Sequence, residues 1–301
     1  MNGIFGALRL PASVVFGSGQ RAALGLMTAQ TGKRALVCTD ARMGQDAQFH
    51  AIIADLKAHD VQVMVYDRTE ADLPMAGITG CVTECAAFKP GVVLGIGGGS
   101  CMDMAKCVAL LLSHGGSLRD YYGENKIPGP VLPVIAVTTT SGTGSEVTPV
   151  AVIADTERGI KVGISSPYLI PRVALCDPEL TLTCPPGLTA VSGADALTHA
   201  IESYTAARRP LTPELTVNNV FVGKNALSDA FGLLALKNIF EALPVAVKDG
   251  KNLAAREKMM LASLAAGCAF GTAGTAAAHA IQYPVGNATH TPHGRIPELT
   301  K

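Results

Sequence analysis

The stretch VVLGIGGGSCMDMAK, from Val92 to Lys106, decides the fold of this chain. It begins with a continuous apolar run, which is typical of a strand buried on both faces of a sheet. Three consecutive glycines, Gly97 to Gly99, then let the backbone turn and approach a ligand closely, and a helical pattern opens at Ser100. A strand, a glycine turn and a helix in this order predict one unit of a parallel α/β sheet.

The same alternation surrounds this unit in the first half of the chain. We predict further strands at RALVCTD, VQVMVYD and PVIAVTTT, and helices near residues 45–58, 75–88 and 100–112. From about Thr189 the pattern changes to long Ala- and Leu-rich segments that read as helices, after a break at Pro185–Pro186–Gly187. The sequence therefore predicts an N-terminal α/β domain over residues 1–187 and an all-α domain over residues 188–301.

Composition and charge narrow the class of partner. The 301 residues are 48% hydrophobic and 16% charged, and their formal net charge is zero. Such a chain buries a sizeable core and lacks the basic surplus that favours nucleic acid or an anionic membrane surface. We therefore expect a small-molecule partner.

Cysteine usage and apolar segments bear on the compartment. The eight cysteines follow neither a zinc-ribbon nor a disulfide-scaffold spacing, and Cys81 and Cys85 are expected to be ordinary buried thiols. No signal peptide is evident, so we expect a cytoplasmic protein. The uncharged stretch from Met259 to Ile281 is rich in Ala, Gly, Thr and Ser, and is expected to pack inside a soluble helical bundle rather than to cross a membrane.

Two loops at one edge of the predicted sheet suit a dinucleotide. The turn around Gly98 precedes a helix whose free N–H groups favour a pyrophosphate, although it matches neither G-x-G-x-x-G nor a P-loop. The loop TTTSGTGSEVT, from Thr138 to Thr148, offers hydroxyls to ribose and phosphate oxygens. Asp40, at the end of a predicted strand, is placed to bind an adenosine ribose, which favours NAD over NADP. Alternatively, the turn around Gly98 is only a tight turn, the loop from Thr138 to Thr148 is a polar surface loop, and Asp40 is a turn residue that ends the strand.

The segment SGADALTHAIESY carries a possible metal site. Asp195 and His199 are four residues apart on a predicted helix, so both side chains lie on one face. A carboxylate and an imidazole together suit iron or zinc. Alternatively, Ser192 and Asp195 have the spacing of a capping box, in which case Asp195 would only cap the helix.

Histidines near the end of the sequence favour the metal interpretation. His279, His290 and His293 are three of only seven histidines, and two prolines and a glycine between them allow the chain to turn. Asp195, His199, His279 and His293 could then close around one ion.

Several motifs together resemble a known family. GGGS followed by Asp103, then TTTSGTGSE, DALTHAIE and H-x13-H ending in PHG, match the iron-containing alcohol dehydrogenases in order and in spacing. The resemblance implies a dehydroquinate synthase-like fold, with a dinucleotide-binding domain, a helical metal-binding domain and the active site between them. It implies the metal ligands Asp195, His199, His279 and His293, and cofactor contacts from Asp40, Gly97, Gly98, Ser100, Asp103, Thr139, Thr140, Thr143 and Lys161.

The resemblance also implies a reaction. It is metal-assisted, NAD(P)-dependent interconversion of a small alcohol and its aldehyde or ketone by direct hydride transfer, with Fe²⁺ or Zn²⁺ as the Lewis acid. We expect NAD in preference to NADP. A maleylacetate reductase-like enzyme is the alternative within the family. The apolar second half further predicts a homo-oligomer, most simply a dimer.

Two features depart from the family pattern. Tyr283 stands four residues after His279, where many relatives have a second histidine assigned to proton relay, so Tyr283 and His290 are the candidate catalytic groups. Relatives continue with further helices after PHG, whereas this sequence ends at Lys301, so we expect the helical domain to be incomplete. A dinucleotide-binding remnant with weak or no catalytic activity is therefore the alternative function.

Overall fold

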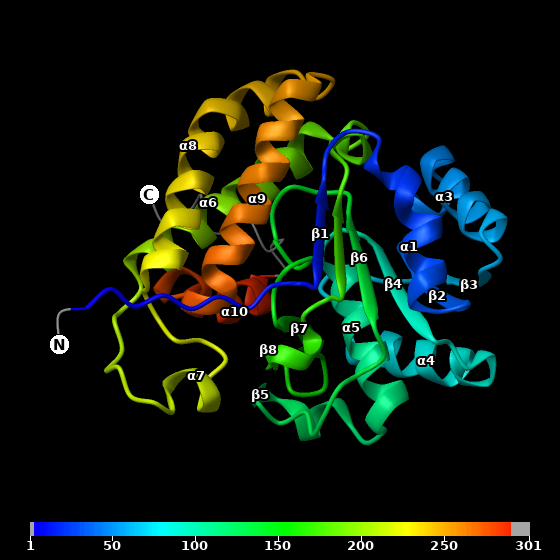
Figure 1. The fold of residues 1–301 in the computed structure, drawn as a ribbon, viewed down its shortest axis with the longest axis horizontal. Helices are drawn as coiled ribbons and strands as arrows, with labels where there is room; N and C mark the ends of the chain where they lie inside the picture. Colours follow the sequence, from blue (N-terminus) through cyan, green and yellow to red (C-terminus); the bar gives the residue numbers. More distant parts are fainter. Residues whose placement is uncertain (1–2, 290–301) are drawn as a thin grey trace.

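The computed structural model describes residues 3–289, apart from the side chains of residues 287 and 288. A six-stranded parallel sheet lies at the centre of the first half (Figure 1). Its order is β1-β9-β6-β4-β2-β3, and every neighbouring pair is parallel. The strands are β1 (Ser13–Phe16), β2 (Arg34–Cys38), β3 (Gln62–Tyr66), β4 (Val92–Gly97), β6 (Val134–Thr138) and β9 (Val173–Cys176).

Helices cover both faces of this sheet, as the sequence predicts. The longer ones are α1 (Leu24–Thr31), α3 (Ala47–Ala58), α4 (Met75–Cys85) and α5 (Gly99–His114). The short ones are η1 (Gln20–Ala23), α2 (Ala41–Gly44), η2 (Ala86–Phe88), η3 (Leu118–Tyr121), η4 (Pro167–Leu169) and η5 (Pro178–Thr181).

The pleat of β2 explains its unbroken apolar sequence. Ala35 and Val37 pack in a core cluster with α1 and α3, whereas Leu36 and Cys38 pack in a second cluster with α4 and α5. Successive side chains of a strand point to opposite faces, so a strand buried on both faces has no polar alternation. The predicted burial of the cysteines is confirmed as well, since Cys81 and Cys85 are both 0% exposed.

A small second sheet lies beside the large one and is absent from the sequence prediction. Its order is β5-β8-β7, and its strands are β5 (Gly123–Glu124), β7 (Val150–Asp155) and β8 (Ile160–Ser165). The strands β7 and β8 form an antiparallel hairpin. The predicted strands are continuous apolar runs buried on both faces, whereas β7 and β8 are only partly buried along one face, so the sequence pattern does not predict this hairpin.

The second half is helical. It contains α6 (Pro186–Thr205), α7 (Leu215–Asn218), α8 (Ala226–Lys248), α9 (Leu253–Ala273) and α10 (Ala277–Thr289). Alanines on α6, α8 and α9 form much of their shared core, which lets these helices approach closely. The last strand of the large sheet ends at Cys176 and α6 begins at Pro186, and the division at residue 187 stays a prediction.

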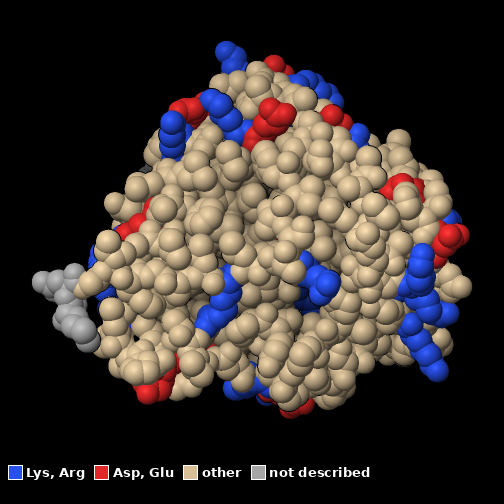
Figure 2. Space-filling model, viewed as in Figure 1, with Lys and Arg blue, Asp and Glu red and all other residues tan. Residues whose placement is uncertain are grey.

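The uncharged apolar segment from Met259 to Ile281 is interrupted in the structure. Between α9 and α10 the chain bends by 100°, so Met259 to Ile281 is not one continuous helix. Within the described residues, α8 is the one single helix long and apolar enough to cross a membrane, a property that core helices of soluble proteins share. On the face drawn in Figure 2, charged side chains of both signs lie scattered and mainly at the margins.

The loop of residues 139–148 joins the two halves. Gly142 lies against Ser192 of α6, and Gly144 lies against Gly267 of α9. Gly144 has a φ of +60°, and a Cβ added there would stand 2.5 Å from the Cα of Gly267. Backbone therefore meets backbone at Gly144 and Gly267, with no side chain between them.

Replacing Gly144 tests this contact. Gly144→Ala is expected to lower the free energy of unfolding by roughly 2–4 kcal/mol, because alanine is strained at a positive φ and the neighbouring backbone cannot move away. Gly80→Ala is the matched control, since Gly80 lies on α4 with no atom within 4 Å of an added Cβ. That change should stabilise the protein by about 0.5–1 kcal/mol. Urea denaturation of both variants measures the difference, and equal midpoints would contradict the close approach.

Glu146, in the same loop, is a buried carboxyl group. It is 1% exposed, and neither carboxylate oxygen forms a hydrogen bond to another described residue. Burial raises the pKa of Glu146 to about 7. The charged form is therefore disfavoured in the folded state.

This burial predicts a pH dependence of stability. Because the folded-state pKa lies above the ordinary value of 4.5, the folded protein binds a proton that the unfolded chain has already lost, and stability falls as the pH rises from about 4.5 to 7. Glu146→Gln removes this dependence. Thermal unfolding of both proteins is measured at several pH values. The stability of the variant relative to the wild type should increase up to about pH 7 and stay constant above it. A difference that does not vary with pH would refute the assignment.

Candidate active site

A cavity of about 770 Å³ lies where the carboxyl ends of the parallel strands face the helical half. This is the usual ligand position in an open α/β sheet. The predicted cofactor residues that line it are Asp40, Gly98, Ser100, Asp103, Thr139, Thr140, Thr143 and Lys161. Gly97 is the last residue of β4 and begins the glycine turn, but it does not line the cavity.

The two predicted cofactor loops touch each other. The helix α5 begins at Gly99, and its N-cap residue Gly98 has no side chain to cap the first turn. A Cβ added at Gly99 would stand 2.6 Å from Cγ2 of Thr143, so only glycine allows the second loop to pack this closely. The first N–H groups of α5 and the hydroxyls of the second loop thus border one cavity, which suits a phosphate.

Asp40 has a structural contact in addition to its place in the cavity. It is the N-cap residue of α2, and its Oδ1 accepts the backbone N–H of Met43 at 2.8 Å. Its Oδ2 lies 3.7 Å from the thiol of Cys101, which donates. Asp40 therefore has a structural role in the turn after β2, and ribose binding by Asp40 stays a prediction.

Asp103, which lines the cavity, forms a buried ion pair with Lys106, which does not. The hydroxyl of Ser145 donates to Oδ1 of Asp103 at 2.5 Å, and the N–H of Val152 donates to Oδ2 at 2.9 Å. Lys106 is 0% exposed and donates to Ser145 and to the carbonyl of Val150, both at 2.8 Å. These contacts bind α5 to the second loop and to β7, and a contact of Asp103 with a cofactor stays a prediction.

Lys161 lies on β8 at the far side of the cavity. Its Nζ is 2.5 Å from Oδ1 of Asp72, and both residues line the cavity. A cation at this position suits a phosphate or ribose oxygen, and its contact with a cofactor stays a prediction.

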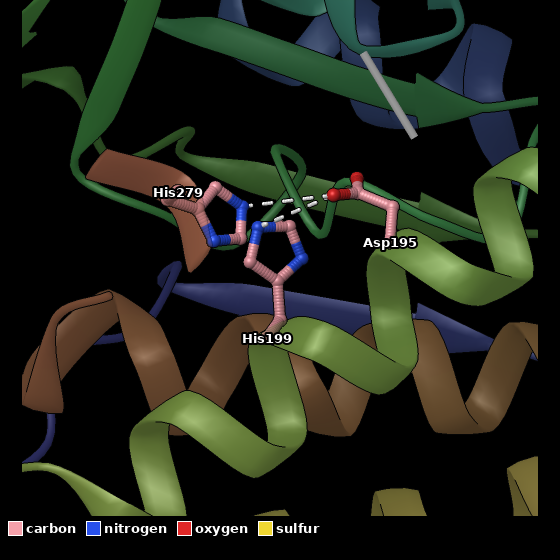
Figure 3. Close-up of side chains that lie close together, drawn as sticks. All are labelled: Asp195, His199 and His279. Atoms are coloured by element: carbon pink, nitrogen blue, oxygen red, sulfur yellow. Dashed lines mark ion pairs between the residues drawn. The ribbon is translucent and has the colours of Figure 1, made fainter. Parts of the chain in front are cut away.

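Three of the four predicted metal ligands converge in the same cavity (Figure 3). Ligand atoms of Asp195, His199 and His279 all lie within 4.8 Å of one another, and the three residues are buried. Oδ1 of Asp195 is 3.9 Å from Nε2 of His199 and 3.6 Å from Nε2 of His279. Ligands about 2.1 Å from a tetrahedral ion lie about 3.4 Å apart, so this donor set fits a divalent metal. His290 and His293 lie outside the described residues.

The helices explain why these side chains meet. Asp195 and His199 stand one turn apart on α6, and His279 belongs to the first turn of α10. The helix α6 begins at Pro186, and the hydroxyl of Ser192 donates to the carbonyl of Leu188 at 2.7 Å, inside the helix. Asp195 therefore does not cap this helix, and the capping-box alternative is wrong.

Electrostatics around His279 favour its protonated form when no metal is bound. Burial lowers the pKa of His279, but hydrogen bonds with Asp195 and Glu202 outweigh burial and raise it to about 9. A metal ion would have to displace that proton, since only the neutral imidazole is a ligand.

Tyr283 lines the cavity one turn after His279, and the two rings contact edge to face with centroids 6.3 Å apart. Burial, followed by the charge of Asp195, raises the pKa of Tyr283 well above its ordinary value. The phenol therefore keeps its proton at neutral pH and can donate a hydrogen bond.

Sequence reasoning missed several residues at the site. Phe270 of α9 stacks on the ring of His199, with centroids 4.0 Å apart and an interplanar angle of 12°. Glu202 lies 2.5 Å from Nδ1 of His279. Its position three residues after His199 on the same helix was an available signal, because residues three apart share a face. Phe221 and Thr275 also line the cavity, and no local motif marks them.

Comparison with known families agrees with this geometry. The family described as iron-containing alcohol dehydrogenase matches residues 11–178. Its C-terminal family, described as Fe-containing alcohol dehydrogenase, matches residues 189–299.

Individual relatives support the same assignment. The chain is 35% identical over 286 residues to the NAD-dependent methanol dehydrogenase of Bacillus methanolicus, covering 95% of this chain and 71% of the relative. It is 35% identical over 263 residues to the sulfoacetaldehyde reductase of Bilophila wadsworthia, covering 87% of this chain and 64% of the relative.

A solved structure shows the same fold. The structure of a 1,3-propanediol oxidoreductase superposes with a TM-score of 0.89 at 31% identity, covering 97% of this chain and 73% of that one. Both the predicted family and the predicted fold class are confirmed. This chain, with a parallel dinucleotide-type sheet, a helical half and a buried Asp-His-His cluster between them, belongs to the iron-containing alcohol dehydrogenase family.

Proposed function

We propose that this chain binds NAD and one divalent metal ion in the cavity and interconverts a small alcohol with its aldehyde or ketone. The observation that carries the proposal is the cluster of Asp195, His199 and His279 in the wall of the cavity that the two glycine- and threonine-rich loops also line. The names of the relatives, a methanol dehydrogenase, a sulfoacetaldehyde reductase and a propanediol oxidoreductase, support a small alcohol or aldehyde as substrate.

Different residues bind the metal, bind the dinucleotide and exclude water. A divalent metal held by Asp195, His199 and His279 would supply Lewis acidity toward the alcohol or carbonyl oxygen. The turn at Gly98 and the hydroxyls of Thr139, Thr140 and Thr143 hold the dinucleotide at the strand ends. Phe270 fixes the ring plane of His199 by stacking and contributes an apolar wall that excludes water.

Proton handling in this chain falls to Tyr283 and His290. Tyr283 donates a hydrogen bond to the substrate oxygen, because its raised pKa keeps the phenol protonated. We assign proton relay to His290. Replacing it in His290→Gln should remove the relay and change the pH profile of turnover.

Finer properties belong to the same proposal. We propose NAD in preference to NADP, iron or zinc as the metal, His293 as the fourth ligand, a homodimer and a cytoplasmic location. A maleylacetate reductase-like activity is disfavoured, because the intact metal cluster suits members of the family that use a metal.

Metal-dependent turnover is the first test. Purified protein is assayed for NAD-dependent oxidation of a panel of small alcohols, with and without Fe²⁺ or Zn²⁺ under anaerobic conditions. Added metal should raise turnover, and Asp195→Ala should lower kcat/KM by about 100-fold or more because a ligand is lost. Binding of NADH, followed by its fluorescence, should stay unchanged in the variant. Turnover that needs neither metal nor Asp195 would refute the proposal, whereas NADH binding without any turnover would identify a cofactor-binding remnant.

Cofactor preference is tested at Asp40. Asp40→Asn keeps a good helix N-cap and removes the negative charge, so it separates the cap from the charge. If Asp40 repels a 2′-phosphate, the ratio of kcat/KM for NADP to that for NAD should rise by about tenfold, which corresponds to about 1.4 kcal/mol. Asp46→Asn is the control, because Asp46 caps α3 and does not line the cavity. An unchanged ratio in Asp40→Asn would assign Asp40 to the cap alone.

A further inference from the structure

Glu202 is buried beside the metal cluster without being part of it. It lies on α6 and is 5% exposed. Its Oε2 is 2.5 Å from Nδ1 of His279, and its Oε1 accepts the backbone N–H groups of Ala278 at 2.6 Å and of His279 at 3.2 Å. One carboxyl group thus receives three hydrogen bonds, all from the first turn of α10.

These contacts fix which nitrogen of His279 carries a proton. Two backbone N–H groups directed at Oε1 favour the carboxylate form of Glu202, and a carboxylate can only accept. Nδ1 of His279 must therefore donate, so that once the ring loses its other proton the lone pair lies on Nε2. That nitrogen faces Oδ1 of Asp195 at 3.6 Å, on the side where the cluster would hold a metal.

The same contacts hold the start of α10. The chain bends by 100° between α9 and α10, and the first N–H groups of a helix have no partner within the helix. Glu202 supplies acceptors to two of them from a different helix, 76 and 77 positions earlier in the chain. A negative charge at this end also interacts favourably with the helix dipole. The place of His279 in the cavity therefore depends on Glu202.

We propose that Glu202 is a positioning residue, which sets the tautomer and the orientation of His279 for metal binding. The inference rests on the proposed metal-dependent function. A carboxylate that orients a histidine ligand in this way typically changes metal affinity by about 10- to 100-fold.

Metal affinity tests the proposal without any measurement of turnover. The dissociation constants of Zn²⁺ and Co²⁺ are measured by competition with a chromophoric chelator for the wild type, Glu202→Gln, Asp195→Ala and Glu146→Gln. We expect Glu202→Gln to bind both metals about 10- to 100-fold more weakly, with unchanged affinity for NADH. Glu146→Gln is the matched control, because it also replaces a buried glutamate, at 1% exposure, and does not contact the cluster. It should bind metal like the wild type.

The tautomer of His279 separates positioning from a general loss of structure. In the metal-free wild type, at a pH above the His279 pKa of about 9, ¹⁵N shifts of labelled histidine should show Nδ1 protonated at His279, with the assignment taken from His279→Gln. In Glu202→Gln this signal should move toward a mixture of tautomers, while circular dichroism and the melting temperature stay close to those of the wild type. Glu202→Asp, whose side chain is one methylene shorter, should not restore the affinity fully.

The outcomes distinguish the inference from the proposed function. If Asp195→Ala weakens metal binding while Glu202→Gln matches the wild type in affinity and tautomer, the role of Glu202 is refuted and the metal site stands. Weaker binding in Glu202→Gln with an unchanged tautomer also refutes positioning. If Asp195→Ala binds metal as tightly as the wild type, the proposed metal site fails, and the inference fails with it.

Discussion

The arrangement of the site depends on the backbone contact between the loop of residues 139–148 and the helices α6 and α9. Gly144 packs directly on Gly267, and Gly142 packs on Ser192. Close packing without an intervening side chain leaves little freedom to shift, because interiors are dense and backbone atoms cannot choose another rotamer. The loop that would bind the cofactor is thereby fixed relative to the helix that carries Asp195 and His199.

Buried charge holds the other side of the same loop. Lys106 is fully buried, and its ammonium is satisfied by Ser145, by two carbonyl groups and by the nearby carboxylate of Asp103. Burial lowers the pKa of Lys106 and raises that of Asp103, and their mutual attraction opposes both effects. Breaking such a pair leaves an uncompensated buried charge and typically costs about 3–5 kcal/mol. The pair therefore keeps the glycine turn of α5, the second loop and β7 in one rigid unit beneath the cavity.

Around the cluster of Asp195, His199 and His279, rigidity comes from contacts between helices that are distant in sequence. His199 is held between the ring of Phe270 from α9 and the ring of His279 from α10, with centroids 4.0 Å and 4.5 Å away. Glu202 fixes the far nitrogen of His279. The three helices thus define the positions of the donor atoms, which would reduce the reorganisation that metal binding requires.

The sequence by itself determined the parallel sheet, its covering helices and the pairing of Asp195 with His199. Strands buried on both faces need continuous apolar runs, and side chains that share one face of a helix need a spacing of three or four residues, so both leave local patterns. Other features required the tertiary structure. The contact of Gly144 with Gly267, the stacking of Phe270 on His199 and the hydrogen bond between Glu202 and His279 join segments that are far apart along the chain and share no sequence pattern. Only packing brings such segments together, because spatial neighbours that are distant along the chain share no local period.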